Sequence, residues 1–133
     1  MRQGLDNNEF KAYYQPIVDI DGKTLLAAEV LARWHHRSRG LLAPAHFLPT
    51  MVADRLIDGL FRTLLEQGLT LLRELRRQAM PTTLAFNLHP SQLTSPTLAD
   101  DVGELLARHE TPATAILLSL IHISEPTRLR RIS

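Results

Sequence analysis

The sequence contains no cysteine, so disulfide bonds, thiolate zinc sites and cysteine nucleophiles are excluded from its chemistry. It has no apolar run near the roughly 18 residues of a membrane span, and its first residues lack the apolar core of a signal peptide. Neither sign of charge dominates, because 15 Lys and Arg stand against 14 Asp and Glu, for a formal net charge of +1. That balance predicts no bulk attraction to nucleic acid or to a membrane surface. Together these absences favour a soluble domain in the cytoplasm.

The 133 residues, 44% of them hydrophobic, suffice for one small domain with a modest core. The pattern of residues predicts strands over 10–20 and 24–34, a loop over 35–43, helices over 44–53 and 55–79, a strand over 82–88, a helix with Ser95 as its N-cap, and a strand from residue 115. Asp21-Gly22 is a tight turn that makes the first two strands a hairpin. Pro16 lacks a backbone hydrogen-bond donor, which predicts that the first strand lies at an edge or is irregular at this residue. The later strand–helix–strand unit predicts an α/β fold with parallel pairing.

Two groups of basic residues have simple structural interpretations. Arg73, Arg76 and Arg77 lie at the end of the long helix, where positive charge suits the helix dipole, and are expected to be a solvated helix end. His35 and His36 follow a predicted strand and are expected in a solvated loop, since no second pair at metal-ligand spacing accompanies them. Neither group predicts a phosphate or metal site.

Glu29 and Asn87 are polar residues inside apolar strands, and buried polar side chains need partners. Both lie near strand ends, and the carboxyl ends of the strands form the active face of a parallel α/β barrel. A carboxylate and an amide oxygen are suited to Mg²⁺ or Mn²⁺. Arg33 is four residues after Glu29, on the same side of the strand, and could complement a phosphate. A structural Glu–Arg ion pair and an asparagine that bonds only the backbone are the alternative interpretation.

Four segments, in this order, resemble the EAL domain family. They are YYQPIVDIDGK, LLAAEVLARW with Glu29-Val30-Leu31 in place of Glu-Ala-Leu, GLLAPAHFLPTM and LAFNLHPSQL. The similarity runs from about Gly4 to Leu117, and several independent motifs agree in order and spacing. This makes the resemblance specific.

The resemblance implies a TIM-like (β/α)₈ barrel whose first strand is antiparallel to the others, and hydrolysis of cyclic di-GMP to pGpG with Mg²⁺ or Mn²⁺. It further implies that Glu29 and Asn87 are metal ligands, that Arg33 contacts a substrate phosphate, and that Gln15 and Leu31 line the substrate site. Members of the family are often fused to GGDEF or sensory domains. The full-length protein from which this chain derives, here called the parent protein, could form a homodimer.

The resemblance stops at the fourth strand of the barrel. The family carries a glutamate ligand there, in Glu-(Ile/Leu/Val)-Thr-Glu, whereas here Ile-Leu-Leu leads into Ser119. A complete barrel needs roughly 250 residues, so about half of it is present. The segment LSLIHISEPTR matches, codon by codon, the translation of a transposon-based sequencing adapter. We therefore predict residues 1–117 to be the N-terminal part of an EAL domain and residues 118–133 a non-native tail; a divergent natural C-terminus is the alternative.

The sequence thus predicts a truncated EAL domain of a bacterial cyclic di-GMP phosphodiesterase, inactive as the fragment itself. The alternative function is a degenerate EAL domain that binds cyclic di-GMP without cutting it and signals through partners. Gln15, Glu29, Arg33 and Asn87 are all present, which favours the catalytic interpretation.

Overall fold

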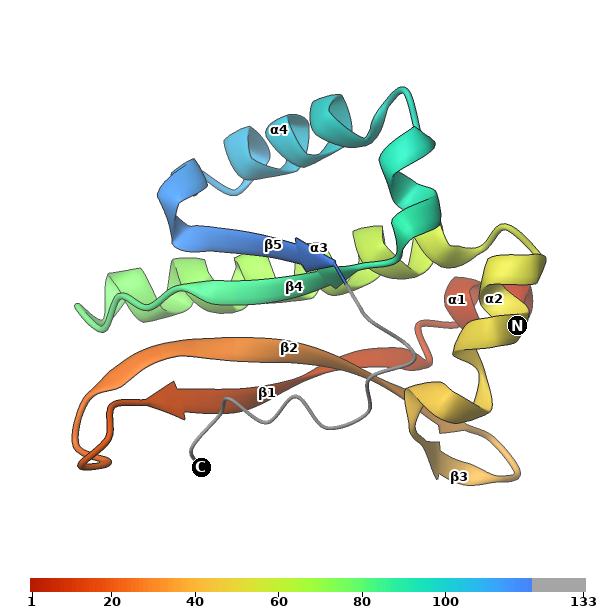
Figure 1. Ribbon diagram of the computed structural model, residues 1–133, viewed down its shortest axis with the longest axis horizontal. Coiled ribbons are helices and arrows are strands. Elements are labelled where there is room, and N and C mark those ends of the chain that lie inside the picture. Colours follow the sequence, from red (N-terminus) through yellow and green to blue (C-terminus); the bar gives the residue numbers. More distant parts are fainter. Residues whose placement is uncertain (121–133) are drawn as a thin grey trace.

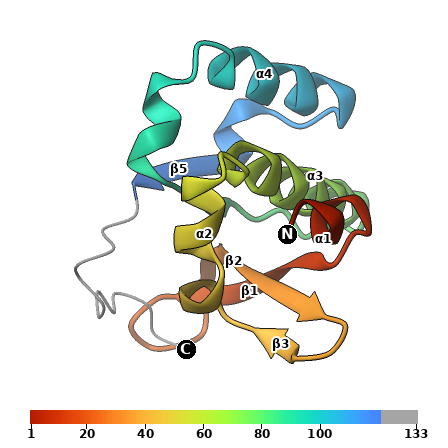
Figure 2. The same ribbon diagram turned by 90° about the vertical axis from the view of Figure 1, so that its right-hand side faces the viewer.

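The computed structural model describes residues 1–120 as one twisted sheet with helices packed against it (Figure 1). The strands are β1 (Phe10–Val18), β2 (Leu25–His36), β3 (Gly40–Leu42), β4 (Leu84–Leu88) and β5 (Ile116–Leu120). The helices are α1 (Arg2–Asp6), α2 (Leu48–Ala53), α3 (Ile57–Arg77) and α4 (Leu98–Arg108), with 3₁₀ turns η1 (Pro44–His46), η2 (Pro90–Thr94) and η3 (Ala113–Ala115). Figure 2 shows β3 projecting from the far end of β2.

The order of strands in the sheet is β1-β2-β4-β5, with β3 paired to β2. β1 runs antiparallel to β2, whereas β2 and β4, and then β4 and β5, are parallel. The predicted α/β fold and antiparallel first strand are therefore confirmed. β1 is an edge strand of the described sheet, as Pro16 predicts, because the ring nitrogen of proline cannot donate to a neighbouring strand.

The turn between β1 and β2 depends on a residue with left-handed backbone geometry. Gly22 has φ of 73°, a conformation that glycine adopts at little steric cost. The Gly22 amide donates to the Asp19 carbonyl at 2.9 Å, and the Lys23 amide donates to the Asp19 carboxylate at 3.2 Å. Hydrogen bonds from Asp21, and then from Thr24 and Lys23, hold the pKa of Asp19 below its ordinary value. The predicted hairpin is confirmed, but its connection takes up residues 19–24 and is longer than the tight Asp21-Gly22 turn that the sequence predicts.

Helix α3 packs its apolar stripe against the sheet. Its buried residues are Leu60, Phe61, Leu64, Leu65, Gly68, Leu69 and Leu72. Alternate residues of the strands complete this core, among them Phe10, Val30, Leu84 and Phe86. Burying one such side chain contributes about 1.5–3 kcal/mol, so this contact of helix with sheet is the main stabilising layer. The alternation also assigns the remaining strand residues to the opposite side of the sheet, here called the inner face.

Gly68 allows α3 to approach β4 closely. A Cβ atom at this position would lie 2.7 Å from Cζ of Phe86 and 3.1 Å from Cδ1 of Leu84. Both of those side chains are fully buried and cannot move aside easily. Overpacking of a core costs about 1–3 kcal/mol, which exceeds the about 0.5–1 kcal/mol that alanine gains over glycine in a helix.

We therefore expect Gly68→Ala to lower the free energy of unfolding by about 1–2 kcal/mol in urea denaturation followed by circular dichroism. Gly103 in α4 is a matched control, because no atom outside the adjacent backbone of its own helix lies within 4 Å of a Cβ built there. Gly103→Ala should stabilise the protein by about 0.5–1 kcal/mol. Equal effects of the two substitutions would contradict the close approach of α3 to the sheet.

Gln67 of α3 covers the outer edge of β1. Its Oε1 accepts a hydrogen bond from the Ala12 amide at 2.7 Å, and its Nε2 donates to the Phe10 carbonyl at 2.9 Å. The side-chain amide thus occupies the backbone positions that a further strand would use. With Pro16 farther along the same strand, this contact blunts the β1 edge against unwanted strand addition.

Three local predictions are wrong. Residues 35–43 are not a loop, because β2 continues to His36 and Gly40–Leu42 returns as β3. The helix predicted over 44–53 is divided at Phe47, which has φ of −138°. Ser95 does not cap a helix: the chain first forms η2, and α4 begins at Leu98 after Thr97.

The basic end of α3 is only partly the solvated surface that the sequence predicts. Arg77 and Arg73 are exposed and pair with Glu74 and Glu110. Arg76 instead donates Nη2 to the Glu110 carbonyl at 2.7 Å, just beyond the end of α4. That contact ties α3 to α4, so the prediction of a purely solvated end is wrong for Arg76.

Two further predictions concern the non-native tail, residues 118–133, and the absence of a membrane-spanning segment. β5 includes residues 118–120, the first part of the predicted tail. Residues 121–133, on which most of that prediction falls, lie outside the described residues. Within residues 1–120, no helix is long and apolar enough to span a bilayer.

Candidate metal and nucleotide site

Glu29 and Asn87 meet on the inner face of the sheet. Glu29 of β2 lies opposite Ala85 of β4 in the parallel ladder, so Asn87 is two residues farther along its strand. Nδ2 of Asn87 donates a hydrogen bond to Oε2 of Glu29 at 3.0 Å. Two residues 58 positions apart in the sequence are thus brought into contact, because parallel strands place their carboxyl ends together.

The three predicted substrate residues lie on the same face. Gln15 is directly opposite Glu29 in the antiparallel ladder of β1 and β2, and Leu31 is opposite Tyr13. Arg33 is half-buried and donates Nη1 to the Ala32 carbonyl at 2.7 Å. The alternation of β2 places Glu29, Leu31 and Arg33 on one side, as the sequence predicts.

Ser119 extends the site onto a third strand. It is opposite Asn87 in the ladder of β4 and β5, and its hydroxyl lies 3.4 Å from Oδ1 of Asn87. In the sequence, Ser119 marks only the point where the family pattern stops. Its position in an exposed edge strand carries no sequence signal of a site, and only the strand register assigns it to this group.

The donor set of the site suits a hard cation but is incomplete. A carboxylate, an amide oxygen and a hydroxyl are oxygen ligands of the kind that Mg²⁺ and Mn²⁺ take. Asn87 presents its NH₂ group to Glu29, and a half-turn of the amide would present Oδ1 to an ion beside that carboxylate. Within residues 1–120, no three His, Cys, Asp or Glu side chains are grouped to hold a metal. Glu29 and Asn87 therefore fit as two ligands of a larger set.

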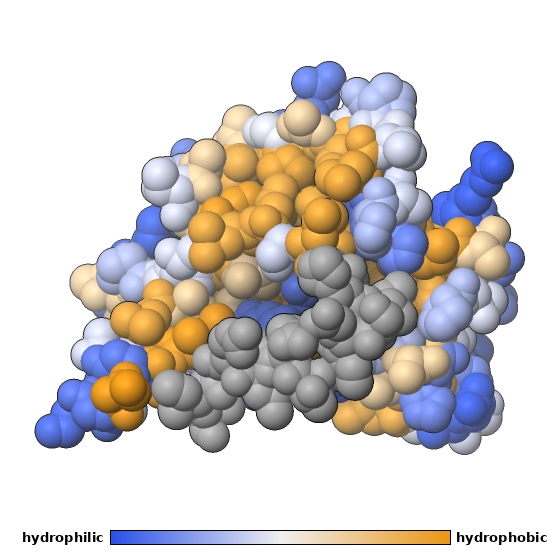
Figure 3. Space-filling view, in the orientation of Figure 1, coloured by the Kyte–Doolittle hydropathy of each residue, from blue (hydrophilic) through white to orange (hydrophobic). Residues whose placement is uncertain are grey.

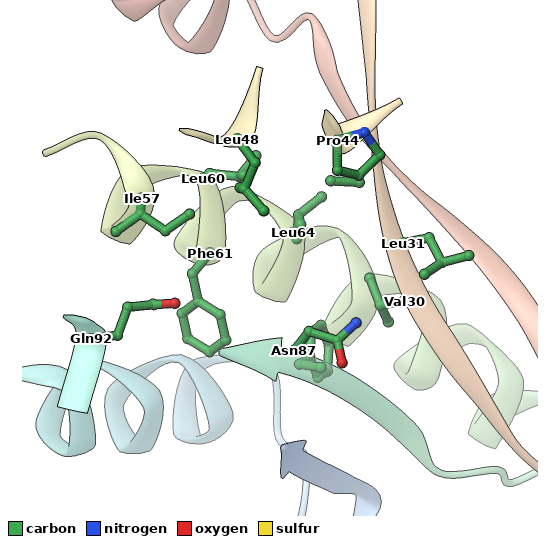
Figure 4. Close-up of a pocket in the computed structure, with 12 residues that line it drawn as sticks. Val30, Leu31, Pro44, Leu48, Ile57, Leu60, Phe61, Leu64, Asn87 and Gln92 are labelled. Atoms are coloured by element: carbon green, nitrogen blue, oxygen red, sulfur yellow. The ribbon is translucent and has the colours of Figure 1, made fainter. Parts of the chain in front are cut away.

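A cavity of about 160 Å³ lies beside the site, between the sheet and the helices. Figure 4 shows apolar side chains from α3 and the neighbouring turns around it, with Asn87 and Gln92 as the only polar residues among the twelve that line it. Buried Gln92 accepts the His89 amide at 2.8 Å, which fixes the turn after β4. Leu31 and Asn87, two of the predicted site residues, are among the residues that line this cavity, so the cavity borders the candidate site.

Tyr14 lies on the helix side of β1, next to Gln15 but facing away from it. Burial raises the pKa of the Tyr14 phenol above its ordinary value, so the group stays neutral at physiological pH. It packs against the core and contributes no charge to the inner face.

The prediction of a solvated loop at His35 and His36 is wrong, since both end β2. Nε2 of His35 lies 3.0 Å from the hydroxyl of Tyr13. Nδ1 of His36 accepts hydrogen bonds from the amides of Ser38 and Arg39, both at 3.1 Å, and so shapes the turn into β3. The sequence pattern gave no signal of the contact between Tyr13 and His35.

The sheet and its antiparallel first strand define a barrel-type α/β domain, and the carboxylate–amide pair is a candidate ligand site on its inner face. The sequence profile of the EAL domain family matches residues 1–131, and the chain belongs to this family. It is 48% identical over 118 residues to the cyclic di-GMP phosphodiesterase RocR of Pseudomonas aeruginosa. That match covers 89% of this chain and 30% of RocR, so the chain spans less than a third of this relative.

Solved structures agree with the fold. The PaMucR phosphodiesterase, in complex with c-di-GMP, superposes with a TM-score of 0.83 at 29% identity, covering 88% of this chain and 48% of that one. The c-di-GMP-bound FimX EAL domain of P. aeruginosa has a TM-score of 0.78 at 24% identity, covering 90% of this chain and 47% of that one, and supports the fold alone. The predicted incomplete TIM-like barrel of EAL type is therefore confirmed. The boundary after residue 117 stays a prediction.

Proposed function

We propose that this chain is part of a metal-dependent cyclic di-GMP phosphodiesterase, in which Glu29 and Asn87 hold Mg²⁺ or Mn²⁺. The observation that carries the proposal is the hydrogen bond of 3.0 Å between them, which places a carboxylate and an amide on adjacent parallel strands of the inner face. The similarity to RocR, whose name states this activity, supports the choice of reaction.

In this proposal each of the five site residues has a role that follows from the chemistry of its side chain. Glu29 and Asn87 would hold the metal, which when bound neutralises charge on the attacked phosphate and activates water. Arg33 would pair with a phosphate oxygen, because its planar guanidinium matches that geometry. Gln15, opposite Glu29, and Leu31, opposite Tyr13, would line the dinucleotide.

We further propose that the 133-residue chain does not hydrolyse cyclic di-GMP by itself. Its described residues offer one carboxylate at the site, whereas metal-assisted phosphodiester hydrolysis uses several anionic ligands to hold its ions. The parent protein would be cytoplasmic, and fusion to GGDEF or sensory domains and homodimer formation are further expectations for it.

The test compares hydrolysis of cyclic di-GMP with Mn²⁺ by this chain and by an extended protein. In the extended protein, residues 1–117 are followed by the corresponding remainder of the EAL domain of RocR. Turnover to pGpG by the extended protein alone would support the proposal. Binding without turnover by the extended protein would favour the second candidate, a non-catalytic receptor, and turnover by the 133-residue chain would refute the account of the missing ligands.

A further inference from the structure

Tyr13 and His35 form an exposed aromatic pair at one end of the inner face. The hydroxyl of Tyr13 lies 3.0 Å from Nε2 of His35, and the ring centroids are 5.8 Å apart at an angle of 40°. Tyr13 is opposite Leu31 in the β1–β2 ladder, so its side chain reaches four residues along β2 to meet His35. The Tyr13 side chain therefore extends past Arg33, which is opposite Lys11 in the same ladder.

The core does not need this pair. The side chains of β1 and β2 that face the helices belong to the alternate residues of each strand. Among them are Phe10 and Trp34, whose ring centroids are 4.9 Å apart in a stacked arrangement. Tyr13 is 39% exposed and His35 is exposed as well. A hydrogen bond between two exposed side chains adds little to stability, because water satisfies the same groups in the unfolded chain.

The side chains at the Tyr13–His35 end of the inner face combine aromatic rings with basic groups, as the binding of one nucleotide requires. Flat aromatic side chains stack on a base of any sequence, and basic side chains pair with its phosphate. Here two rings stand beside Arg33 and Lys11, while the nearest carboxylate of β2 on the same face is Glu29, at the metal end. Glu9 faces the other side, where its Oε1 accepts a hydrogen bond from Nε1 of Trp34 at 3.0 Å.

The spacing along β2 also suits a nucleotide. The Tyr13 side chain runs from the level of Leu31 to that of His35, and Arg33 is midway, roughly 7 Å along the strand from each of these two residues. That is the order of the separation between a phosphate and its own base. A phosphate bound by Arg33 would therefore bring its base against Tyr13.

We infer that Tyr13 and His35 are a nucleobase subsite, in which a guanine of the cyclic dinucleotide stacks on Tyr13 while His35 holds the phenol in place. This inference rests on the proposed function and adds a specificity-determining contact to it. Tyr13 touches the ligand, and His35 acts as a positioning residue through its hydrogen bond to the Tyr13 hydroxyl.

The experiment measures the affinity of the full 133-residue chain for cyclic di-GMP by titration calorimetry. Removal of a stacked base contact costs about five- to 150-fold in affinity. We expect Tyr13→Ala to weaken binding at least about tenfold, whereas Tyr13→Phe and His35→Ala, which each remove only the positioning hydrogen bond, should stay within about threefold of the wild type. His46→Ala is the control, because His46 is an exposed histidine of η1 on no strand of the inner face.

Fluorescence of Trp34, the single tryptophan, checks that each variant keeps the packing of β1 on β2. Tyr13→Ala with wild-type affinity would overturn the subsite while leaving the proposed function intact. An equal loss for Tyr13→Phe and Tyr13→Ala would also overturn it, because the hydroxyl, not the ring, would then carry the contact. A wild-type chain that does not bind cyclic di-GMP would overturn the subsite, whereas the proposed function is judged separately by turnover of the extended protein.

Discussion

Glu29→Gln in the extended protein is expected to lower the turnover of cyclic di-GMP by at least about 10²-fold, with a much smaller change in KM. The substitution keeps an oxygen acceptor for Nδ2 of Asn87, so the local packing should survive. It removes the negative charge by which the Glu29 carboxylate would attract a hard cation. The loss should therefore appear in kcat and in the concentration of Mn²⁺ needed for half-maximal rate.

Glu66→Gln is the matched control, since Glu66 is an exposed carboxylate of α3 that pairs only loosely with Arg62 at 3.8 Å. It should leave turnover within about twofold of the parent, as surface substitutions usually do. Near-normal turnover of Glu29→Gln at low Mn²⁺ would remove Glu29 from the metal site. Partial recovery at high Mn²⁺ would instead identify the defect as weakened metal binding.

The contact between Glu29 and Asn87 could be predicted because it depends on the simplest rules of a parallel sheet. A polar residue stands out in an apolar strand, and the period of two fixes the face on which it lies. The long apolar period of α3 likewise predicts its buried stripe. Gly68 is the exception, because a glycine carries no hydropathy signal of the close approach to Phe86 that it permits.

The start of helix α4 was harder to predict, because it depends on which of several nearby side chains forms the capping hydrogen bonds. Ser95 followed by proline is a reasonable N-cap, yet His89 and Gln92 already form a capping box six residues earlier and start η2 instead. The Ser95 amide then donates to the Gln92 carbonyl at 3.1 Å, which closes that turn. The helix α4 can begin only after this turn ends.

Register explains why the contact of Tyr13 with His35 and the position of Ser119 escaped prediction. Hydropathy assigns a residue to a face but does not say which residue lies opposite it on the next strand. Tyr13 and His35 meet only because the hairpin aligns Gln15 with Glu29. Ser119 joins the site only because β5 aligns it with Asn87.

Ser119→Glu is expected to tighten the binding of Mn²⁺ to the 133-residue chain by about tenfold or more. The hydroxyl of Ser119 already lies 3.4 Å from Oδ1 of Asn87, so a carboxylate here would join Glu29 and Asn87 as a third oxygen ligand. Without metal, two carboxylates in one site repel each other, and we expect a lower melting temperature. Added Mn²⁺ should reverse that loss, because a ligand stabilises the state that binds it.

Leu118→Glu is the matched control for this substitution, because strand alternation turns residue 118 away from Asn87 while adding the same charge to β5. Figure 3 shows a broad apolar surface over the region of β4 and β5. Three leucines of β5, Leu117, Leu118 and Leu120, are exposed. A charge anywhere on this surface should improve solubility, but only one at residue 119 should bind Mn²⁺. Equal Mn²⁺ affinity of the two variants, measured by electron paramagnetic resonance of the free ion, would show that the increase reflects charge alone. A gain confined to Ser119→Glu would place a metal ion between β2, β4 and β5.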